Sequence, residues 1–326
     1  MSAAHTVSGA LSAESVALMA RTLAELGQLP DPTTLTPEQG RAQSAFASAR
    51  CNLNLPPMHS VSEVWIDADL ELGSDRCRLK ILVPKGAGHG AILFVHGGGF
   101  AFCSPETHER CARTLAIESG MPVVLPDYRL APECPFPAGL KDVVSALRHL
   151  FSATSASGVT RGPLLVAGDS AGANLALAAM LHEEAAGRPL PDGGLLFYGN
   201  YARSFDTPSY VHFSEGPGLT RGKMQRYWDF YAGGQNIEDD PLACPLVATE
   251  EQLAAMPPLY LMAAEVDPLL SDTLLLSGRL KALGRSDELS IIPGVMHGFL
   301  QNTSELSAAR EALAAAGNAA RRQAGR

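Results

Sequence analysis

Residues 164–184 read LLVAGDSAGANLALAAMLHEE, and this stretch decides the fold. An apolar run, Leu164 to Ala167, passes through Gly168-Asp169-Ser170-Ala171-Gly172 into a helix-like segment from Asn174. The two glycines lack Cβ atoms where a strand and a helix crowd together, so Ser170 is predicted to occupy a strained turn with its hydroxyl exposed. The G-x-S-x-G pattern alone is a weak signal, and its strand-turn-helix context is what indicates a nucleophile.

A second glycine-rich segment, His96-Gly97-Gly98-Gly99, directly follows the apolar run Ala91 to Val95. A strand that ends in bare backbone is expected to offer N–H groups to a ligand. Side chains at these three positions would block the approach of a substrate to the backbone, which explains why all three residues are glycine. The alternative interpretation is an ordinary glycine-rich turn.

A serine hydroxyl is a poor nucleophile at its own pKa, so Ser170 requires a base and a group that orients the base. Three histidines follow it: His182 on the next helix, His212 in an aromatic-rich insert, and His297. His297 is the best candidate, because it follows the strand-like run Leu289 to Ile292 and is predicted to lie in a loop, where it can reach the strand ends.

The acid is predicted to be Asp267, which follows the apolar run Leu259 to Ala264. The chain order is then Ser170, Asp267, His297, the order expected of an α/β-hydrolase.

Four blocks make the chain resemble the hormone-sensitive-lipase-like branch of the α/β-hydrolases, which includes the bacterial family IV esterases. They are His96 to Gly99, Asp127-Tyr128-Arg129-Leu130-Ala131-Pro132-Glu133, Gly168 to Gly172, and His297-Gly298-Phe299. The aspartate before the serine is typical of one subgroup of this branch.

The resemblance implies a catalytic triad and an oxyanion hole. The implied residues are Ser170 as nucleophile, Asp267 and His297 as acid and base, and Gly98, Gly99 and Ala171 as backbone donors. His96 is expected to support the loop by a hydrogen bond rather than to carry a proton.

The chain departs from the family pattern at two places. Ser271 stands where the family often has an acid, and Asp272 comes next, so Asp272 remains an alternative partner for His297. Gly199-Asn200 follow Tyr198 where the family commonly has proline, which changes the expected local shape of the pocket.

Eight apolar runs predict an α/β fold: an eight-stranded, mostly parallel sheet flanked by helices, with a helical cap. The first two runs alternate polar and apolar residues, as in an antiparallel hairpin at a half-exposed edge, whereas the later runs are apolar throughout, as in buried parallel strands. The predicted strands are 62–70, 76–83, 90–95, 122–126, 163–167, 194–198, 258–263 and 288–292.

The catalytic domain is predicted to be formed by residues 53–199 and 246–326. Residues 1–52 are expected to form cap helices, the first with Val16, Met19, Leu23 and Leu26 on one face, and the second begun by Thr36-Pro37. Residues 200–245 form an aromatic-rich cap insert. The side chains expected to line a substrate pocket are Phe100, Tyr198, Tyr201, Trp228 and Phe299.

Composition narrows the possible partners. With 326 residues, 46% of them hydrophobic, the chain suffices for one large domain with an accessory element. A net charge of −9 and a pI near 5.5 disfavour nucleic acid and anionic membranes as partners. No signal-peptide pattern or membrane-length apolar run is present, so a cytoplasmic location is expected.

The six cysteines have irregular spacing and no C-x-x-C pair, which predicts reduced thiols and no metal framework. Cys103 lies just past the glycine loop, either near the pocket or packed in the core.

The predicted activity is hydrolysis of short- to medium-chain carboxylic esters through a serine acyl-enzyme, with a small-molecule ester as substrate and no cofactor. A deacetylase of an acetylated natural product or peptide would use the same triad. A non-catalytic small-molecule receptor on the same fold is a remote alternative, because such receptors typically lack the triad histidine, which this chain has. Relatives often pair through the last strand, here 288–292, so a homodimer is expected.

Overall fold

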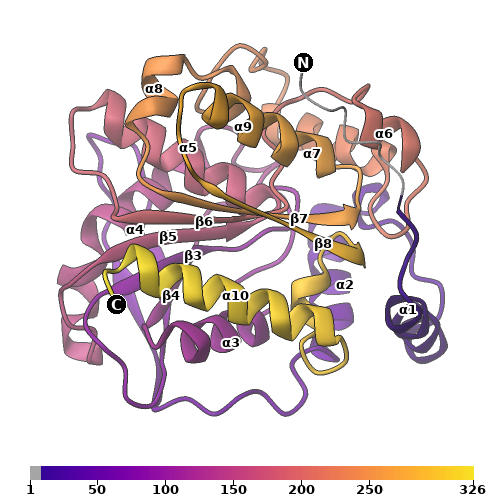
Figure 1. Cartoon of the computed structure of the whole chain (residues 1–326), viewed down its shortest axis with the longest axis horizontal. Coiled ribbons are helices and arrows are strands. Elements are labelled where there is room, and N and C mark those ends of the chain that lie inside the picture. The colour runs from indigo at the N-terminus through magenta and orange to yellow at the C-terminus, as the bar shows by residue number, and fades with distance from the viewer. Residues whose placement is uncertain (1–8) are drawn as a thin grey trace.

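The computed structural model describes residues 9–326, and the few residues before Gly9 that belong to the predicted cap lie outside it. The elements run in the order of Figure 1. The strands are β1 (Ser60–Ile66), β2 (Cys77–Val83), β3 (Ala91–Val95), β4 (Val123–Asp127), β5 (Leu164–Asp169), β6 (Gly193–Phe197), β7 (Leu259–Val266) and β8 (Glu288–Met296). The α-helices are α1 (Ala13–Leu26), α2 (Pro37–Ala49), α3 (Glu109–Ser119), α4 (Ala138–Thr154), α5 (Ala171–Ala185), α6 (Pro208–His212), α7 (Arg221–Ala232), α8 (Glu250–Ala255), α9 (Leu270–Ala282) and α10 (Ser307–Gln323).

One eight-stranded sheet, in the order β1-β2-β4-β3-β5-β6-β7-β8, forms the centre of the molecule. β2 pairs antiparallel with both β1 and β4, and the other strand pairs are parallel. The predicted fold class and all eight strands are confirmed. The last strand is longer than predicted, because β8 continues through Pro293-Gly294 to Met296, directly before His297.

Helices cover both faces of the sheet (Figure 1). α3 and α10 pack together on one face, and α4, α5 and α9 lie on the other. The strand β3 shows why its sequence is apolar throughout: Leu93 and Val95 point into one hydrophobic cluster and Ile92 and Phe94 into the other. Burial on both faces removes the polar alternation of an exposed strand.

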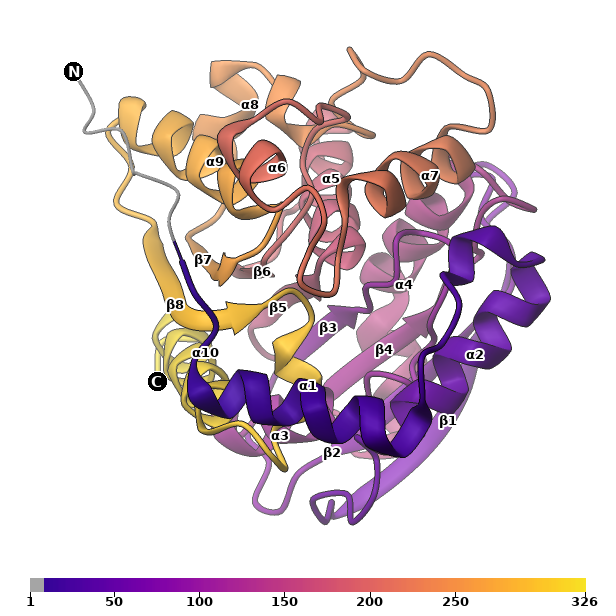
Figure 2. The same cartoon turned by 90° about the vertical axis from the view of Figure 1, so that its right-hand side faces the viewer.

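The carboxyl ends of the parallel strands meet at one edge of the sheet, near which α1, α2, α6 and α7 lie (Figure 2). Arg226 of α7 forms an ion pair with Asp31 and a hydrogen bond with Thr33, so the insert touches the N-terminal segment. The predicted start of α2 is confirmed, since Thr36 caps it and Pro37 is its first residue.

The predicted apolar face of α1 is only partly buried, with Met19 and Leu26 half-buried. Ser15 and Leu18 are the buried residues, whereas Val16 is 53% exposed and Leu23 is 58% exposed. The rotation of α1 follows from polar contacts: the Ser15 hydroxyl donates to the carbonyl oxygen of Gly294, 279 residues away. The hydrophobic pattern carries no information about that contact.

Candidate active site

Ser170 lies on a sharp turn between β5 and α5, here called the elbow. Its backbone is at φ 55° and ψ −123°, a strained conformation for a residue with a side chain. A Cβ on Gly168 would overlap the carbonyl oxygen of Gly172, and a Cβ on Gly172 would overlap that of Val95. The two glycines therefore permit the close approach of strand and helix, as the sequence predicts.

His297 links the serine to an acid. Its Nε2 lies 2.9 Å from the Ser170 hydroxyl oxygen, and its Nδ1 lies 2.6 Å from a carboxylate oxygen of Asp267. The carboxylate accepts only, so Nδ1 carries a proton and Nε2 is free to accept the serine proton. Asp267 is fully buried and follows β7, and the backbone N–H of Leu269 holds its other oxygen at 2.9 Å.

Asp272, the alternative acid, has a different position. Its carboxylate accepts the backbone N–H of Tyr201 at 2.8 Å and has no contact with His297. Burial, with the charge of Asp267 adding to it, raises the pKa of Asp272 to about 8 against the opposing backbone hydrogen bonds. The geometry thus joins His297 to Asp267, while Asp272 attaches the start of the insert.

The other two histidines lie elsewhere. His182 is near the end of α5 and contacts Glu183 at 3.1 Å. His212 is exposed at the end of α6, with its ring against Phe213. The structure brings only His297, of the three histidines after the elbow, to the serine.

The glycine loop, residues 96–103, follows β3 beside the elbow. Gly98 and Gly99 have φ of 111° and 60°. Within residues 9–326, the backbone N–H groups of Gly98, Gly99 and Ala171 have no hydrogen-bond acceptor. These three groups are therefore free to donate to a ligand.

The structure gives a second reason for the glycines. A Cβ on Gly98 would overlap the carbonyl oxygen of Phe102, and one on Gly99 would overlap the Tyr227 ring. The protein's own atoms occupy the space that side chains would need.

His96 is buried inside this loop. Its Nδ1 lies 2.8 Å from the carbonyl oxygen of Gly97, and its ring stacks on Tyr128 at 4.4 Å between centroids. Burial, together with the nearby charge of His108, lowers the pKa of His96 to about 3. A neutral, buried, stacked imidazole suits the predicted supporting role.

Sequence reasoning missed two residues that hold the same loop. The Tyr128 hydroxyl donates to the carbonyl oxygen of His96 at 2.8 Å. Arg41 of α2 donates to the carbonyl oxygen of Ala101 at 3.0 Å and pairs with Glu133. Tyr128 lies in the block from Asp127 to Glu133, so the family resemblance could have identified it. No pattern in the sequence indicates Arg41.

The five predicted pocket side chains are all buried, each at most 2% exposed. Phe100 stacks on Tyr231 at 3.8 Å and lies 5.4 Å from Trp228. The Tyr198 ring lies 4.9 Å from the His297 ring and 5.8 Å from the Phe299 ring, between centroids. Tyr201 packs against Gly199. The structure places these rings in the core that supports the site, so it gives no support to an open pocket lined by them.

Cys103 is partly buried, with φ 69° and its Cβ close to the Gly98 backbone. Burial raises the pKa of its thiol to about 12, so it remains protonated at neutral pH. All six cysteines are free thiols. The five surface cavities described, of about 330 to 550 Å³, contain none of the triad residues.

Comparison with known proteins decides the family. The family described as alpha/beta hydrolase fold matches residues 92–301. The chain belongs to the α/β-hydrolases, in the hormone-sensitive-lipase-like branch. It is 35% identical over 223 residues to carboxylesterase NlhH of Mycobacterium tuberculosis, covering 68% of this chain and 70% of that protein.

Solved structures of esterases are similar over nearly the whole chain. A thermostable esterase from Pseudomonas putida ECU1011 superposes with a TM-score of 0.88 at 29% identity, covering 97% of this hydrolase and 98% of that chain. A hyperthermophilic esterase from Pyrobaculum calidifontis superposes with a TM-score of 0.86 at 30% identity, covering 97% and 99%.

Proposed function

We propose that this hydrolase is a carboxylesterase that cleaves short- to medium-chain acyl esters through a serine acyl-enzyme. The observation that carries the proposal is the position of His297 between the Ser170 hydroxyl and the Asp267 carboxylate. The relatives, a carboxylesterase and esterases, support the same activity.

In this mechanism Ser170 Oγ attacks the ester carbonyl carbon while His297 Nε2 takes the hydroxyl proton. Asp267 holds the imidazole and stabilises its positive charge. The same proton then passes to the leaving alkoxide, and water repeats the sequence to release the acid. The N–H groups of Gly98, Gly99 and Ala171 stabilise the tetrahedral oxyanion, and a single donor of this kind is typically worth about 2.7–4 kcal/mol.

The preference for short acyl chains rests on the packing around the glycine loop. Residues 1–52 and 200–245 are proposed to form the cap, and the contact between Arg226 and Asp31 joins these two segments. Tyr227, from the second segment, packs its ring onto Gly99. A ring in that position limits the space beside the proposed oxyanion donors.

The test is hydrolysis of p-nitrophenyl esters of two to twelve carbons by the purified protein and by Ser170→Ala. We expect activity on acetate and butyrate and a loss of about 10⁴-fold or more in Ser170→Ala. Ser145→Ala is the matched control, because Ser145 is a buried serine outside the site. Undiminished turnover by Ser170→Ala contradicts the nucleophile, and a preference beyond ten carbons contradicts the chain length.

Homodimer formation through β8 is also part of the proposal. β8 is the last strand of the sheet order, and Leu289 on it is 36% exposed. Light scattering should give a dimer that Leu289→Lys converts to a monomer; a monomeric parent protein contradicts the pairing. Among residues 9–326 no helix is long and apolar enough to cross a membrane.

A further inference from the structure

A second histidine–carboxylate pair lies next to the same serine, since its carboxylate belongs to the preceding residue. Asp169 immediately precedes Ser170 and is 3% exposed. One of its oxygens accepts the backbone N–H of Gly97 at 2.9 Å, and the other accepts the Tyr198 hydroxyl at 3.4 Å. His108 Nε2 lies 3.2 Å from the first oxygen. Asp169 therefore touches both the glycine loop and the elbow.

The hydrogen bonds of Thr107 favour a doubly protonated ring at His108. The Thr107 hydroxyl lies 2.8 Å from the carbonyl oxygen of Ser104 and accepts the backbone N–H of Ser104 at 3.0 Å. With its single proton on that carbonyl oxygen, the hydroxyl accepts from His108 Nδ1, which lies 2.9 Å away. Nε2 faces a carboxylate and donates to it. This set of partners fits an imidazolium ion paired with Asp169.

The pKa of Asp169 agrees with this assignment. Burial opposes ionisation, but the charge and hydrogen bond of His108, with the N–H of Gly97, outweigh it and lower the pKa of Asp169. The other titratable ring beside His108 is His96, at 5.6 Å between centroids, and the charge of His108 contributes to keeping it neutral.

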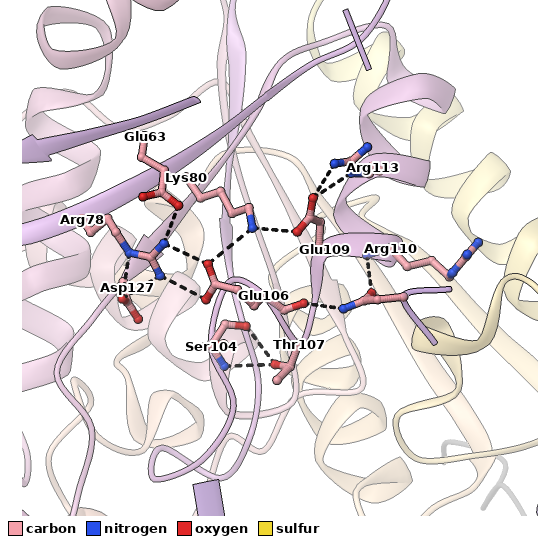
Figure 3. Close-up of polar contacts among 11 residues, drawn as sticks. Glu63, Arg78, Lys80, Ser104, Glu106, Thr107, Glu109, Arg110, Arg113 and Asp127 are labelled. Carbon is pink, nitrogen blue, oxygen red and sulfur yellow. Dashed lines mark hydrogen bonds and ion pairs between the residues drawn. The ribbon is translucent and has the colours of Figure 1, made fainter. Parts of the chain in front are cut away.

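Side chains of β2 bind Glu106 and Glu109, which lie on either side of His108 in the sequence (Figure 3). Arg78 of β2 binds both carboxylate oxygens of Glu106, at 2.9 and 3.0 Å. Lys80, also of β2, binds Glu109 at 2.6 Å. His108 lies between these two anchored residues, so the ion pairs fix the place from which its ring reaches Asp169.

We propose that His108 is a positioning residue for catalysis: it neutralises Asp169 and, through Asp169 and Gly97, holds the glycine loop in the geometry that binds the oxyanion. This inference rests on the proposed esterase function. A lone carboxylate next to the nucleophile would repel the negative charge that develops on the substrate, and the ion pair removes that repulsion while keeping the hydrogen bond to Gly97.

The test compares His108→Gln, Asp169→Asn and the double variant. Glutamine can still donate a hydrogen bond but has no charge, so His108→Gln leaves the carboxylate uncompensated. We expect its kcat on p-nitrophenyl acetate to fall by about 100-fold, with KM within about threefold, because the uncompensated carboxylate opposes the negative charge of the transition state.

The double variant provides the decisive comparison. It restores a neutral pair, in which the amide oxygen introduced by Asp169→Asn accepts the N–H of Gly97, so we expect its kcat to exceed that of His108→Gln by about tenfold or more. Asp169→Asn alone should lose less than His108→Gln. Binding of phenylboronic acid, which forms an anionic tetrahedral adduct with the serine, should weaken in step with kcat.

His182→Gln is the matched control, because His182 also pairs with a carboxylate, Glu183, outside the site. A kcat for His108→Gln within threefold of the parent overturns the proposal. So does a double variant as slow as His108→Gln, because a purely structural role makes two changes at least as harmful as one. If His108→Gln does not fold, the kcat of Asp169→Asn and of the double variant decides in the same way. Activity retained by Ser170→Ala would instead show that the proposed function itself is wrong.

Discussion

Two histidine–carboxylate pairs flank one serine, and they differ in what their imidazoles can still do. His297 meets Asp267 through Nδ1 and has Nε2 directed at the Ser170 hydroxyl. His108 meets Asp169 through Nε2, and its Nδ1 is already bonded to Thr107. The first ring has one nitrogen free to take a proton, whereas both nitrogens of the second are committed as donors.

The two histidines also differ in their exposure to solvent. The His297 side chain is 13% exposed and its ring lies next to the Ser170 hydroxyl, whereas the His108 side chain is 6% exposed and its ring lies beside the rings of Phe94 and His96. A proton carrier needs an open nitrogen near the substrate. A fixed charge needs neither, so the same residue types support chemistry in one pair and geometry in the other.

The largest expected effect separates the two histidines. His297→Gln removes the proton acceptor, so kcat on p-nitrophenyl acetate should fall by about 10⁴-fold or more, against about 100-fold for His108→Gln. His212→Gln, at an exposed position, should leave kcat unchanged. Equal losses for His297→Gln and His108→Gln would abolish the distinction between the pairs.

The acid of the first pair gives the next largest effect. Asp267→Asn should lower kcat by about 10³-fold or more, because the amide cannot stabilise the imidazolium. Asp272→Asn keeps an oxygen for the Tyr201 N–H and replaces a carboxyl whose pKa is raised to about 8, so kcat near pH 7 should change by less than about fivefold. The reverse order of the two losses would make Asp272 the partner of His297.

The loop held by the second pair should be sensitive to added volume. In Gly99→Ala the new methyl group meets the Tyr227 ring at a φ of 60°, so the loop must shift and kcat should fall by about 10-fold or more. Gly158→Ala is the control, since its φ of 83° is also positive but nothing lies near the added carbon. It should cost only about 1 kcal/mol of unfolding free energy.

Tyr227→Ala in the Gly99→Ala background should recover part of the activity by removing the overlapping ring. Failure of this second change to help would indicate that the backbone conformation of Gly99, rather than contact with Tyr227, requires glycine. Steady-state kinetics of the two variants distinguishes these causes.

The smallest expected effect concerns acid stability. Burial raises the pKa of Glu106, but the hydrogen bonds from Arg78 and the charges of Lys80 and Arg78 lower it overall to about 2. Its ordinary pKa is near 4.5, so its contribution to the unfolding free energy is fully present above pH 4.5 and is lost as the pH falls toward 2. Because the side chain is 47% exposed, this contribution should be about 1 kcal/mol at most.

Urea unfolding of the parent protein and Glu106→Gln at pH 6 and pH 3.5 measures this contribution. The difference in unfolding free energy should narrow at the lower pH. A difference independent of pH would mean that packing, rather than the ion pair with Arg78, accounts for the role of Glu106.

Local sequence was sufficient for the elbow and the strands. The strand-turn-helix pattern around Ser170 depends on neighbours in the chain: apolar residues that form a buried strand, and glycines that allow a close crossing. Asp267 and His297 could be selected because each follows an apolar run, and parallel strands bring their carboxyl ends to one edge. The side-chain chemistry of aspartate and histidine then indicated their roles as acid and base.

The remaining features needed contacts between distant residues. Ser15 bonds to Gly294, which sets the rotation of α1, and no periodicity in α1 records that contact. The rings predicted to line a pocket are in the core, because aromatic content predicts burial without saying against which surface.

The sequence by itself determined the positions of the strands, the strained turn at the serine, and the candidates for acid and base. These features follow from neighbours along the chain. Only the tertiary structure decided between Asp267 and Asp272 and joined His108 to Asp169, 61 residues apart. Side-chain pairing and the loss of solvent that sets a charge depend on which distant segments pack together, and that packing exists only in the folded chain.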